Sequence, residues 1–351
     1  NAVNKILPIL KRYLERISIK GAGIVGDKPM FGMMPDWNPA EIIGVSPKPL
    51  ARSLYGFLIT SSIWNEARAS MGYKLLINQE LLYIIGNTPY IDIRKCFNSF
   101  LPSEIPDYIG EILVDSWTKK LEKNRSLHDK IEFEVVTTCT DFSFVRNHSH
   151  KLKELLGGDG FNTYYGKLHS LTLTLIKEAC STKFEKEKKI LDHISPYKKQ
   201  IDNLKKSELP DEILSVFLDT LNLCRSKGTY AFAVLARHGF IAESLLRSIE
   251  DSGAISASRI TNFRQSIQTV TTQLIKDFDD VLINSETYNQ FIFKYGHLRP
   301  STYDICSPTY SERVKLFSSV TKSNKEAKYS KSFQFNSNEI DSIDKLLANY
   351  C

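Results

Sequence analysis

The stretch LLYIIGNTPYIDIR (residues 81–94) decides the class of fold, because it is where the chain most clearly predicts β-strands. Two short apolar runs flank Gly86 and Asn87, a pair of residues that favours the tight turn of a β-hairpin. We therefore expect two antiparallel strands here. A further strand is expected over residues 131–138, where KIEFEVVTT alternates polar and apolar side chains.

Around this β element, the spacing of apolar residues predicts helices almost everywhere. The expected helices cover residues 3–17, 50–71, 107–122, 151–156, 162–180, 184–206, 210–226, 229–251, 256–283, 310–320 and 339–350. Glycines, prolines and methionines break the pattern over residues 19–48, and a polar stretch rich in lysine and serine over 321–337 is interpreted as a linker. The predicted fold class is mainly α with a small β element (α+β).

The composition is that of an ordinary globular protein, with 42% hydrophobic and 25% charged residues, which is enough for a sizeable core. The net charge is +6, but the basic residues are scattered, and the densest run (residues 183–206) alternates in sign like a solvated helical face. No apolar run approaches the length of a membrane-spanning helix, and no signal peptide is visible. We predict no nucleic-acid partner and no membrane partner.

The cysteines are far apart in the sequence and form no CxxC pair: Cys96, Cys139, Cys180, Cys224, Cys306 and Cys351. This spacing argues against a zinc site and against a disulfide framework, and it favours a reducing compartment. We therefore predict a cytoplasmic protein with no metal site. Because the chain starts at Asn1, inside a helical pattern, we expect it to be a piece of a longer protein.

Two short motifs have a plainer interpretation than the chemistry they suggest. GAGIVG (residues 21–26) satisfies the G-x-G-x-x-G pattern of dinucleotide-binding sites, but such a site needs a helix directly after the glycines, and prolines and a further glycine follow here. HSH (residues 148–150) suggests a metal, but imidazoles at i and i+2 converge only on a strand. A surface turn before a helix is the better interpretation. The sequence also has no GxxxxGK[ST] loop for ATP.

Several segments place polar groups in apolar or irregular surroundings. MPDWNPAEIIG (residues 34–44) contains four such candidates, and it also fits a helix start with a proline in the first position. YIDIRKCFNSF (residues 90–100) puts Arg94 on an otherwise apolar strand, where a buried arginine needs an anionic partner. The candidates in these two segments are Asp36, Trp37, Asn38, Glu41, Arg94 and Asn98.

Three further segments have the same character. HDKIEFE (residues 128–134) leaves both a structural role and a site role open for Glu132. ARHGFIAESLL (residues 236–246) places Arg237 and His238 on a very apolar helix, which is typical of a satisfied core pair. KYGHLRPSTYDI (residues 294–305) is either a well-tied turn or a binding loop, and its candidates are His297, Arg299, Tyr303 and Asp304.

Six blocks together resemble the middle region of the phosphoenolpyruvate synthase-like phosphotransferases: FGMMPDWNPAEIIG, PKPLARSLYGFLIT, TPYIDIRKCFNSF, LHDKIEFE, GTYAFAVLARHGFIAESLL and YGHLRPSTYDI. The likeness covers about residues 31–312, and the joint order of the blocks is more specific than any single one. In this family an ATP-grasp domain makes the phosphoryl donor, a swivelling domain carries it on a histidine, and a third domain binds the acceptor. The composition and the first block favour the branch of L-glutamine kinases that act in capsule phosphoramidate synthesis.

The resemblance implies a helical acceptor-binding domain over residues 1–320, the linker at 321–337, and a C-terminal helix at 338–351 that leads toward a phosphohistidine domain. The sequence contains neither an ATP-grasp portion nor the glycine-rich segment that presents the carrier histidine. We therefore expect this chain alone to be inactive and to bind no cofactor. ATP and magnesium are implied for the ATP-grasp domain of the same polypeptide.

The resemblance also implies roles for the candidates. One of His297, Asp304 and Glu132 would remove a proton from the acceptor amide. Arg94 or Arg299 would bind a carboxylate or phosphoryl group. We also expect residues 37–41, 94–98 and 297–304, the last range including Tyr303, to converge on one cleft. Two alternatives remain open. The chain is a kinase domain for another acceptor, or it is a non-catalytic scaffold that binds a small molecule or a partner.

Overall fold

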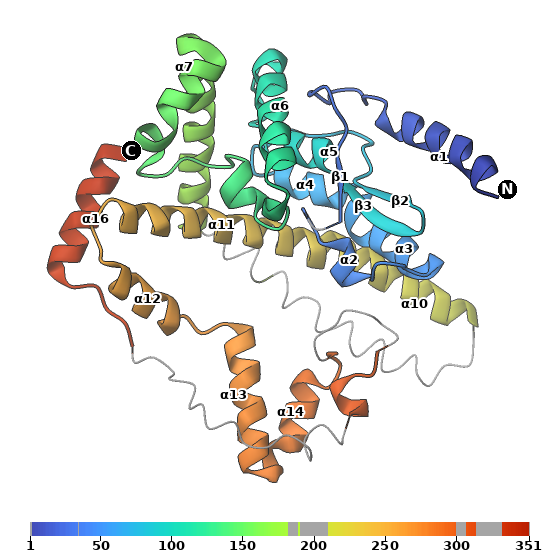
Figure 1. Cartoon of the computed structure of the whole chain (residues 1–351). Coiled ribbons are helices and arrows are strands. Elements are labelled where there is room, and N and C mark those ends of the chain that lie inside the picture. The colour runs from blue at the N-terminus through green and yellow to red at the C-terminus, as the bar shows by residue number, and fades with distance from the viewer. Residues whose placement is uncertain are drawn as a thin grey trace. The chain divides into compact units, whose positions relative to one another are not determined.

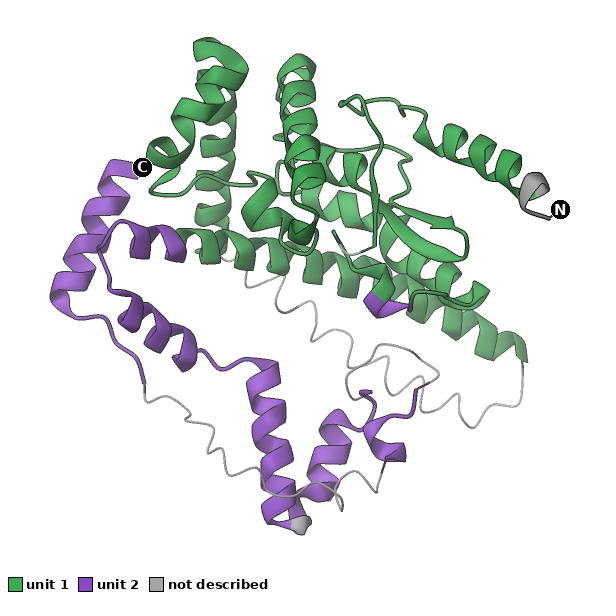
Figure 2. Cartoon of the chain, in the orientation of Figure 1, with its two compact units in different colours: residues 1–40, 45–245 green, residues 41–44, 246–351 purple. Residues whose placement is uncertain are grey.

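The computed structural model of the chain describes residues 2–33, 35–181, 189, 210–299, 307–313 and 332–350. The chain divides into two compact units (Figure 2). Unit 1 comprises Asn1–Ala40 and Val45–Leu245, and unit 2 comprises Glu41–Gly44 and Leu246–Cys351. The predicted fold class, mainly α with a small β element, is confirmed. Among the described residues, no helix combines the length and the apolar character needed to cross a membrane.

A three-stranded antiparallel sheet forms the β element of unit 1 (Figure 1). Its strands are β1 (Phe31–Gly32), β2 (Leu82–Ile85) and β3 (Thr88–Asp92), in the order β1-β3-β2. The predicted hairpin is confirmed, because Ile85 lies opposite Thr88 and the two turn residues between them have φ angles of 59° and 70°. Positive φ at both positions is the geometry of the type I′ turn that joins two twisted strands.

Helices make up most of the rest of unit 1. They are α1 (Ala2–Ser18), α2 (Pro39–Ile42), α3 (Pro49–Tyr55), η1 (Gly56–Thr60), α4 (Ile63–Ala69), α5 (Ile93–Asn98), α6 (Asp107–Lys123), η2 (Arg125–Leu127), η3 (Ile131–Val135), α7 (Phe144–Ala179), α10 (Pro210–Leu223), η5 (Cys224–Thr229) and α11 (Tyr230–Asp251). Only Pro39 and Ala40 of α2 belong to unit 1. The last three follow one another without a gap and form one helical rod, whose residues up to Leu245 belong to unit 1. Non-helical backbone at Gly157 divides α7, where two separate helices were predicted.

The prediction of a strand over residues 131–138 is wrong. Ile131–Val135 form one turn of π-helix, closed by a hydrogen bond of 2.8 Å from the amide of Val136 to the carbonyl of Ile131. Ile131 and Val135 are both buried, so a helical turn places the two apolar side chains on the same side. The alternation of polar and apolar residues fits this turn as well as it fits a strand.

Other expected helices differ in extent. The helix predicted over residues 50–71 is divided into α3, η1 and α4, and the one over 256–283 is divided into two. Of the helix predicted over 310–320, only a short 3-10 turn at Tyr310–Glu312 is described. The helix expected over 184–206 and most of the linker at 321–337 lie outside the described residues.

The core of unit 1 lies where α4, α5 and α6 meet the sheet. Trp64, Phe97, Phe100, Ile109 and Leu113 are fully buried there. The rings of Phe97 and Trp117 meet edge to face, with 6.0 Å between their centroids. This packing fixes the helix faces that carry the polar residues described below.

Where the structure describes unit 2, its regular elements are helical. They are α12 (Ala257–Ser266), α13 (Val270–Ile283), η6 (Ser285–Thr287), α14 (Tyr288–Tyr295), η7 (Tyr310–Glu312) and α16 (Ser337–Tyr350). Buried Val281 on α13 packs against Phe291 and Tyr295 on α14. The C-terminal helix, predicted from residue 339, is confirmed as α16.

Candidate functional site

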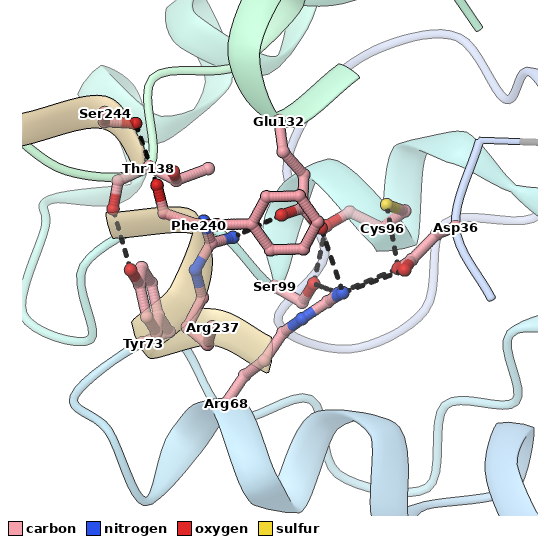
Figure 3. Close-up of polar contacts among 10 residues, drawn as sticks. All are labelled: Asp36, Arg68, Tyr73, Cys96, Ser99, Glu132, Thr138, Arg237, Phe240 and Ser244. Carbon is pink, nitrogen blue, oxygen red and sulfur yellow. Dashed lines mark hydrogen bonds and ion pairs between the residues drawn. The ribbon is translucent and has the colours of Figure 1, made fainter. Parts of the chain in front are cut away.

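Two arginines and two carboxylates form a buried network inside unit 1 (Figure 3). Arg237 lies on α11, Arg68 on α4, Glu132 on η3, and Asp36 in the loop that precedes α2. Only 3% of Arg237, 7% of Arg68 and 9% of Asp36 are exposed. Charges this deeply buried have to be paired, so the geometry of the pairs determines what the site can do.

The four charged side chains form a chain of contacts. Both terminal nitrogens of Arg68 contact Asp36, with Nη1 2.9 Å from Oδ2 and Nη2 2.9 Å from Oδ1, which is a two-pronged pair. The Nη2 atom of Arg68 is also 3.9 Å from Oε1 of Glu132. The other oxygen of Glu132 lies 2.8 Å from Nη1 of Arg237. Glu132 therefore connects the two arginines.

Aromatic rings hold the two guanidinium groups in place. Arg68 lies over the ring of Phe100 at 4.1 Å, and Arg237 lies 5.5 Å from the same ring and 5.1 Å from the ring of Phe240. Burial acts to lower the pKa of Arg68, but the charge of Asp36, with contributions from Cys96 and Glu132, outweighs burial and raises that pKa. Arg68 therefore stays a permanent cation in the core.

Two small side chains complete the Asp36 end of the network. Ser99 Oγ accepts a hydrogen bond of 2.7 Å from Arg68 Nη1 and donates one of 2.6 Å to the carbonyl of Cys96. The thiol of Cys96 donates to Asp36 Oδ2 at 3.2 Å. Burial and the neighbouring charge of Asp36 raise the pKa of this thiol, so Cys96 acts as a hydrogen-bond donor and is not an activated nucleophile.

The Arg237 end of the network is less complete. Its Nε and Nη2 atoms are buried and have no hydrogen-bond partner among the described residues. Buried donors are usually paired, so an arginine with two unmet donors is a candidate to bind an anionic or carbonyl-containing ligand. Close by, the hydroxyl of Tyr73 donates to the carbonyl of Thr138 at 2.7 Å.

A pocket of about 140 Å³ adjoins the network inside unit 1. Its wall is made by α6, by η3 and the extended residues after it, by the first part of α7, and by Ser244 of α11. Glu132, Thr138 and Ser244 all line this pocket. A small molecule bound there would therefore contact the same glutamate that joins the two arginines.

The described residues contain no group of three or more histidine, cysteine or acidic side chains arranged to hold a metal ion. The network offers charge and hydrogen bonds, which are suited to the binding of polar groups.

The structure brings some of the predicted residues together. Asp36 and Glu132 are joined through Arg68, and the hydrogen bond between Cys96 and Asp36 connects the segments around residues 37–41 and 94–98. Trp37, next to Asp36, has a φ angle of 53°, and its ring lies 5.9 Å from that of Phe232. Asn38 directly precedes α2, which begins at Pro39 as the helix-start interpretation predicted.

Arg94 and Asn98 are structural in the described part of the chain. Arg94 lies on α5 instead of on a strand, and it donates to the carbonyl oxygens of Ser18 at 3.0 Å and Asp27 at 3.5 Å. No ion pair of Arg94 with a carboxylate is found among the described residues, and its buried Nε atom has no hydrogen-bond partner there, so an anionic ligand for Arg94 stays a prediction. Asn98 pairs with both the amide and the carbonyl of Val25, at 2.9 and 2.8 Å.

The remaining predicted residues belong to unit 2 or lie outside the described residues. Glu41, His297 and Arg299 are in unit 2, and Tyr303 and Asp304 are not described. His297 is exposed, and Arg299 Nε donates to the carbonyl of Ser307 at 2.8 Å, which ties the two ends of the loop. Convergence of residues 297–304 with the other segments stays a prediction.

Sequence reasoning missed Arg68, although a signal was present. Trp64 and Ala67 lie four residues and one residue before Arg68, and Met71 lies three residues after it. All three are apolar and buried. An arginine in the middle of such an apolar helix face has to meet a buried anion. Ser99, which accepts a hydrogen bond from Arg68, carries no comparable signal, because serine occurs at helix ends for many reasons.

A comparison of the chain with known proteins found no matching protein family, no similar curated protein and no similar solved structure.

Proposed function

We propose that this chain is the acceptor-binding domain of an ATP-dependent phosphotransferase. The phosphoryl group would pass through a phosphohistidine to a small molecule, and the best candidate is the side-chain amide of L-glutamine. The chain would work in the cytoplasm with the ATP-grasp and phosphohistidine domains of one longer polypeptide, and alone it would be inactive.

One observation supports this proposal most strongly. Four of the sequence blocks that resemble the phosphotransferase family supply residues to the same buried network. Asp36 comes from FGMMPDWNPAEIIG, Cys96 and Ser99 from TPYIDIRKCFNSF, Glu132 from LHDKIEFE, and Arg237 from GTYAFAVLARHGFIAESLL. Blocks this far apart in the sequence would not have to meet if each served only local structure.

The chemistry of the network suits an acceptor site. A phosphohistidine brings an activated phosphoryl group, so the acceptor domain contributes positioning and charge neutralisation more than covalent chemistry. Two buried donors of Arg237, Nε and Nη2, have no partner in the described part of the chain, and they would donate to an oxygen of the acceptor or of the phosphoryl group. Glu132 is the proton acceptor that we favour, because of the two predicted bases that the structure describes, Glu132 and His297, only Glu132 lines the pocket.

A second candidate function is a non-catalytic binding domain of the same fold. The observation that favours it is the balance of the network, in which two arginines and two carboxylates pair with one another. In that case the network would specify the fold, and the pocket would bind a metabolite without transferring a group to it.

Calorimetric titration of the chain with L-glutamine tests the first proposal. We expect saturable binding of L-glutamine and weaker binding of D-glutamine and L-glutamate. At a concentration 100 times its dissociation constant, the bound amino acid should stabilise the fold by about 2.7 kcal/mol, visible as a rise in melting temperature. If neither L-glutamine nor any other small primary amide binds, the acceptor-binding proposal is wrong.

A further inference from the structure

The pocket beside the network has a basic side that the proposed function does not use. Helices α6 and α7 lie side by side (Figure 1), and each contributes basic side chains to the pocket wall. Lys120 comes from α6, and His148 and Lys151 come from one face of α7, where residues three apart are neighbours. Three nitrogen-bearing side chains therefore line the same small space.

Glu132, Glu134 and Asp141 line the same pocket, but none of the ion pairs found among the described residues joins one of them to these three basic groups. The ammonium of Lys120 donates to the backbone carbonyl of Glu134. Within the part of the chain that the structure describes, neither Lys120 nor Lys151 forms an ion pair with an acidic side chain. Asp141, which also lines the pocket, accepts a hydrogen bond of 2.8 Å from the amide of Ser143.

Electrostatics show that the basic groups affect one another. Burial, and then the charge of Lys151, lowers the pKa of Lys120, and the charge of Glu134 opposes that shift. Burial also lowers the pKa of His148; Asp141 opposes that shift, and the two lysines reinforce it. A bound anion would relieve the repulsion between the lysines and would accept hydrogen bonds from all three groups.

Another part of the pocket wall is apolar. Leu113 and Trp117 of α6 and Phe144 and Leu152 of α7 line it, and all four are buried. A ligand that fits this wall has an aliphatic part next to its charged group. A fully hydrated inorganic ion would gain nothing from these contacts.

We propose that Lys120, Lys151 and His148 bind the oxyanion of a small organic anion, a carboxylate or a phosphoryl group, whose aliphatic part lies against Trp117 and Leu152. The inference deepens the proposed function and rests on it in one respect, namely that the anion would be the α-carboxylate of the amino-acid acceptor. It gives that carboxylate a partner in unit 1 in place of Arg94, whose Nη1 and Nη2 atoms donate to backbone carbonyls.

Titration of the whole chain with a small set of probes tests this site. The probes are butyrate, glutaramate (L-glutamine without its ammonium), L-glutamine, methylphosphonate and, as a cation of similar size, butylammonium. We expect the carboxylates to bind saturably and butylammonium not to bind. If methylphosphonate binds and none of the carboxylate probes binds, the anion site stands and its ligand is a phosphoryl group.

Substitutions at the two lysines locate the site. Lys120→Met and Lys151→Met keep the aliphatic stem and remove the charge, and each should weaken anion binding 10-fold or more, which corresponds to about 1.4 kcal/mol. Lys119→Met is the matched control, because Lys119 is the exposed neighbour on α6 and does not line the pocket. The Lys119→Met variant should bind the anions with the same affinity as the parent. Ligand-induced changes in tryptophan fluorescence should vanish in Trp117→Phe.

The outcomes separate this site from the proposed function. If butyrate binds in a lysine-dependent way and L-glutamine does not bind, the anion site stands and the glutamine proposal fails. If L-glutamine binds the parent and the Lys120→Met/Lys151→Met double variant equally well, the acceptor proposal stands and this site is overturned. Absence of saturable binding for every anion would also overturn it.

Discussion

Nη1 of Arg237 on α11 lies 2.8 Å from Oε2 of Glu132 on η3, and this ion pair joins two segments separated by 105 positions in the sequence. Arg237 is almost fully buried, and the side chain of Glu132 is 15% exposed. Removal of one partner from a buried pair leaves an uncompensated charge in the core, whereas removal of both leaves none. The pair is therefore suited to a double-mutant cycle.

The first prediction concerns this pair. Glu132→Leu removes the carboxylate from Arg237 and should lower the free energy of unfolding by roughly 3–5 kcal/mol. Adding Arg237→Leu should recover most of the loss, because the second charge is then gone. Urea unfolding of the parent, the two single variants and the double variant gives the coupling energy.

An exposed pair serves as the control for this cycle. Glu104 pairs with Lys167 at the surface, so Glu104→Leu should leave the urea midpoint almost unchanged. A double variant that loses the sum of the two single losses would show that Arg237 and Glu132 are not coupled.

Features set by local chemistry were predictable from the sequence. Gly86 and Asn87 specify their turn by their own backbone preferences, so the hairpin was found. The 3.6-residue spacing of apolar side chains predicted the C-terminal end of α6 to within one residue of its observed position at Lys123. The segment Ile131–Val135 was misassigned because its pattern fits two structures, and the choice between them depends on whether a distant strand is available for pairing.

The site was only partly predictable, for the same physical reason. Asp36 and Glu132 attracted attention as polar residues among apolar ones, and both belong to the network. Arg94 has the same local signature, but its partners are carbonyl oxygens 67 and 76 positions earlier in the sequence. A local pattern shows that a buried charge needs a partner, and only the tertiary fold shows which partner it has.

The second prediction concerns the glycines of GAGIVG. Gly23 and Gly26 have φ angles of 75° and 96°, so alanine is strained at both positions. A Cβ atom at Gly26 would lie 2.5 Å from Cγ1 of Val114, whereas one at Gly23 would have no atom within 4 Å. Gly26→Ala should therefore destabilise the fold by about 1–3 kcal/mol more than Gly23→Ala, because only Gly26 is also overpacked. Equal urea midpoints would show that the close approach of this loop to α6 is not tight.

The third prediction concerns phosphorylation. The sequence has no ATP-binding loop of the GxxxxGK[ST] type and no carrier-histidine segment, so the chain incubated with magnesium and γ-labelled ATP should remain unlabelled. Acid-labile, base-stable labelling is the signature of phosphohistidine. Its stable appearance on any of the seven histidines would contradict the assignment of this chain as an acceptor domain.

The last prediction concerns pH and the attachment of α16 to α12 within unit 2. Both oxygens of Glu339 contact Arg259, at 2.7 and 2.8 Å, and Glu339 also accepts from the amide of Asn336 at 2.9 Å. The hydrogen bond from Arg259, followed by that of the Asn336 amide, lowers the pKa of Glu339 from 4.5 to about 2. Because the folded pKa is depressed, this contact stabilises α16 fully above the unfolded pKa. The stabilisation is then lost as the pH falls from about 4.5 to about 2.

Hydrogen exchange of the α16 amides measures this loss. Protection of α16 should decrease over that pH range in the parent after correction for intrinsic exchange. Glu339→Gln cannot ionise, so its α16 should already be less protected at neutral pH and should show no further loss in the same range. Asp344→Asn is the matched control, since Asp344 lies on the same helix and has no part in the Arg259 contact, and it should keep the parental pH dependence. A parental profile in Glu339→Gln would mean that another group controls the acid response of α16.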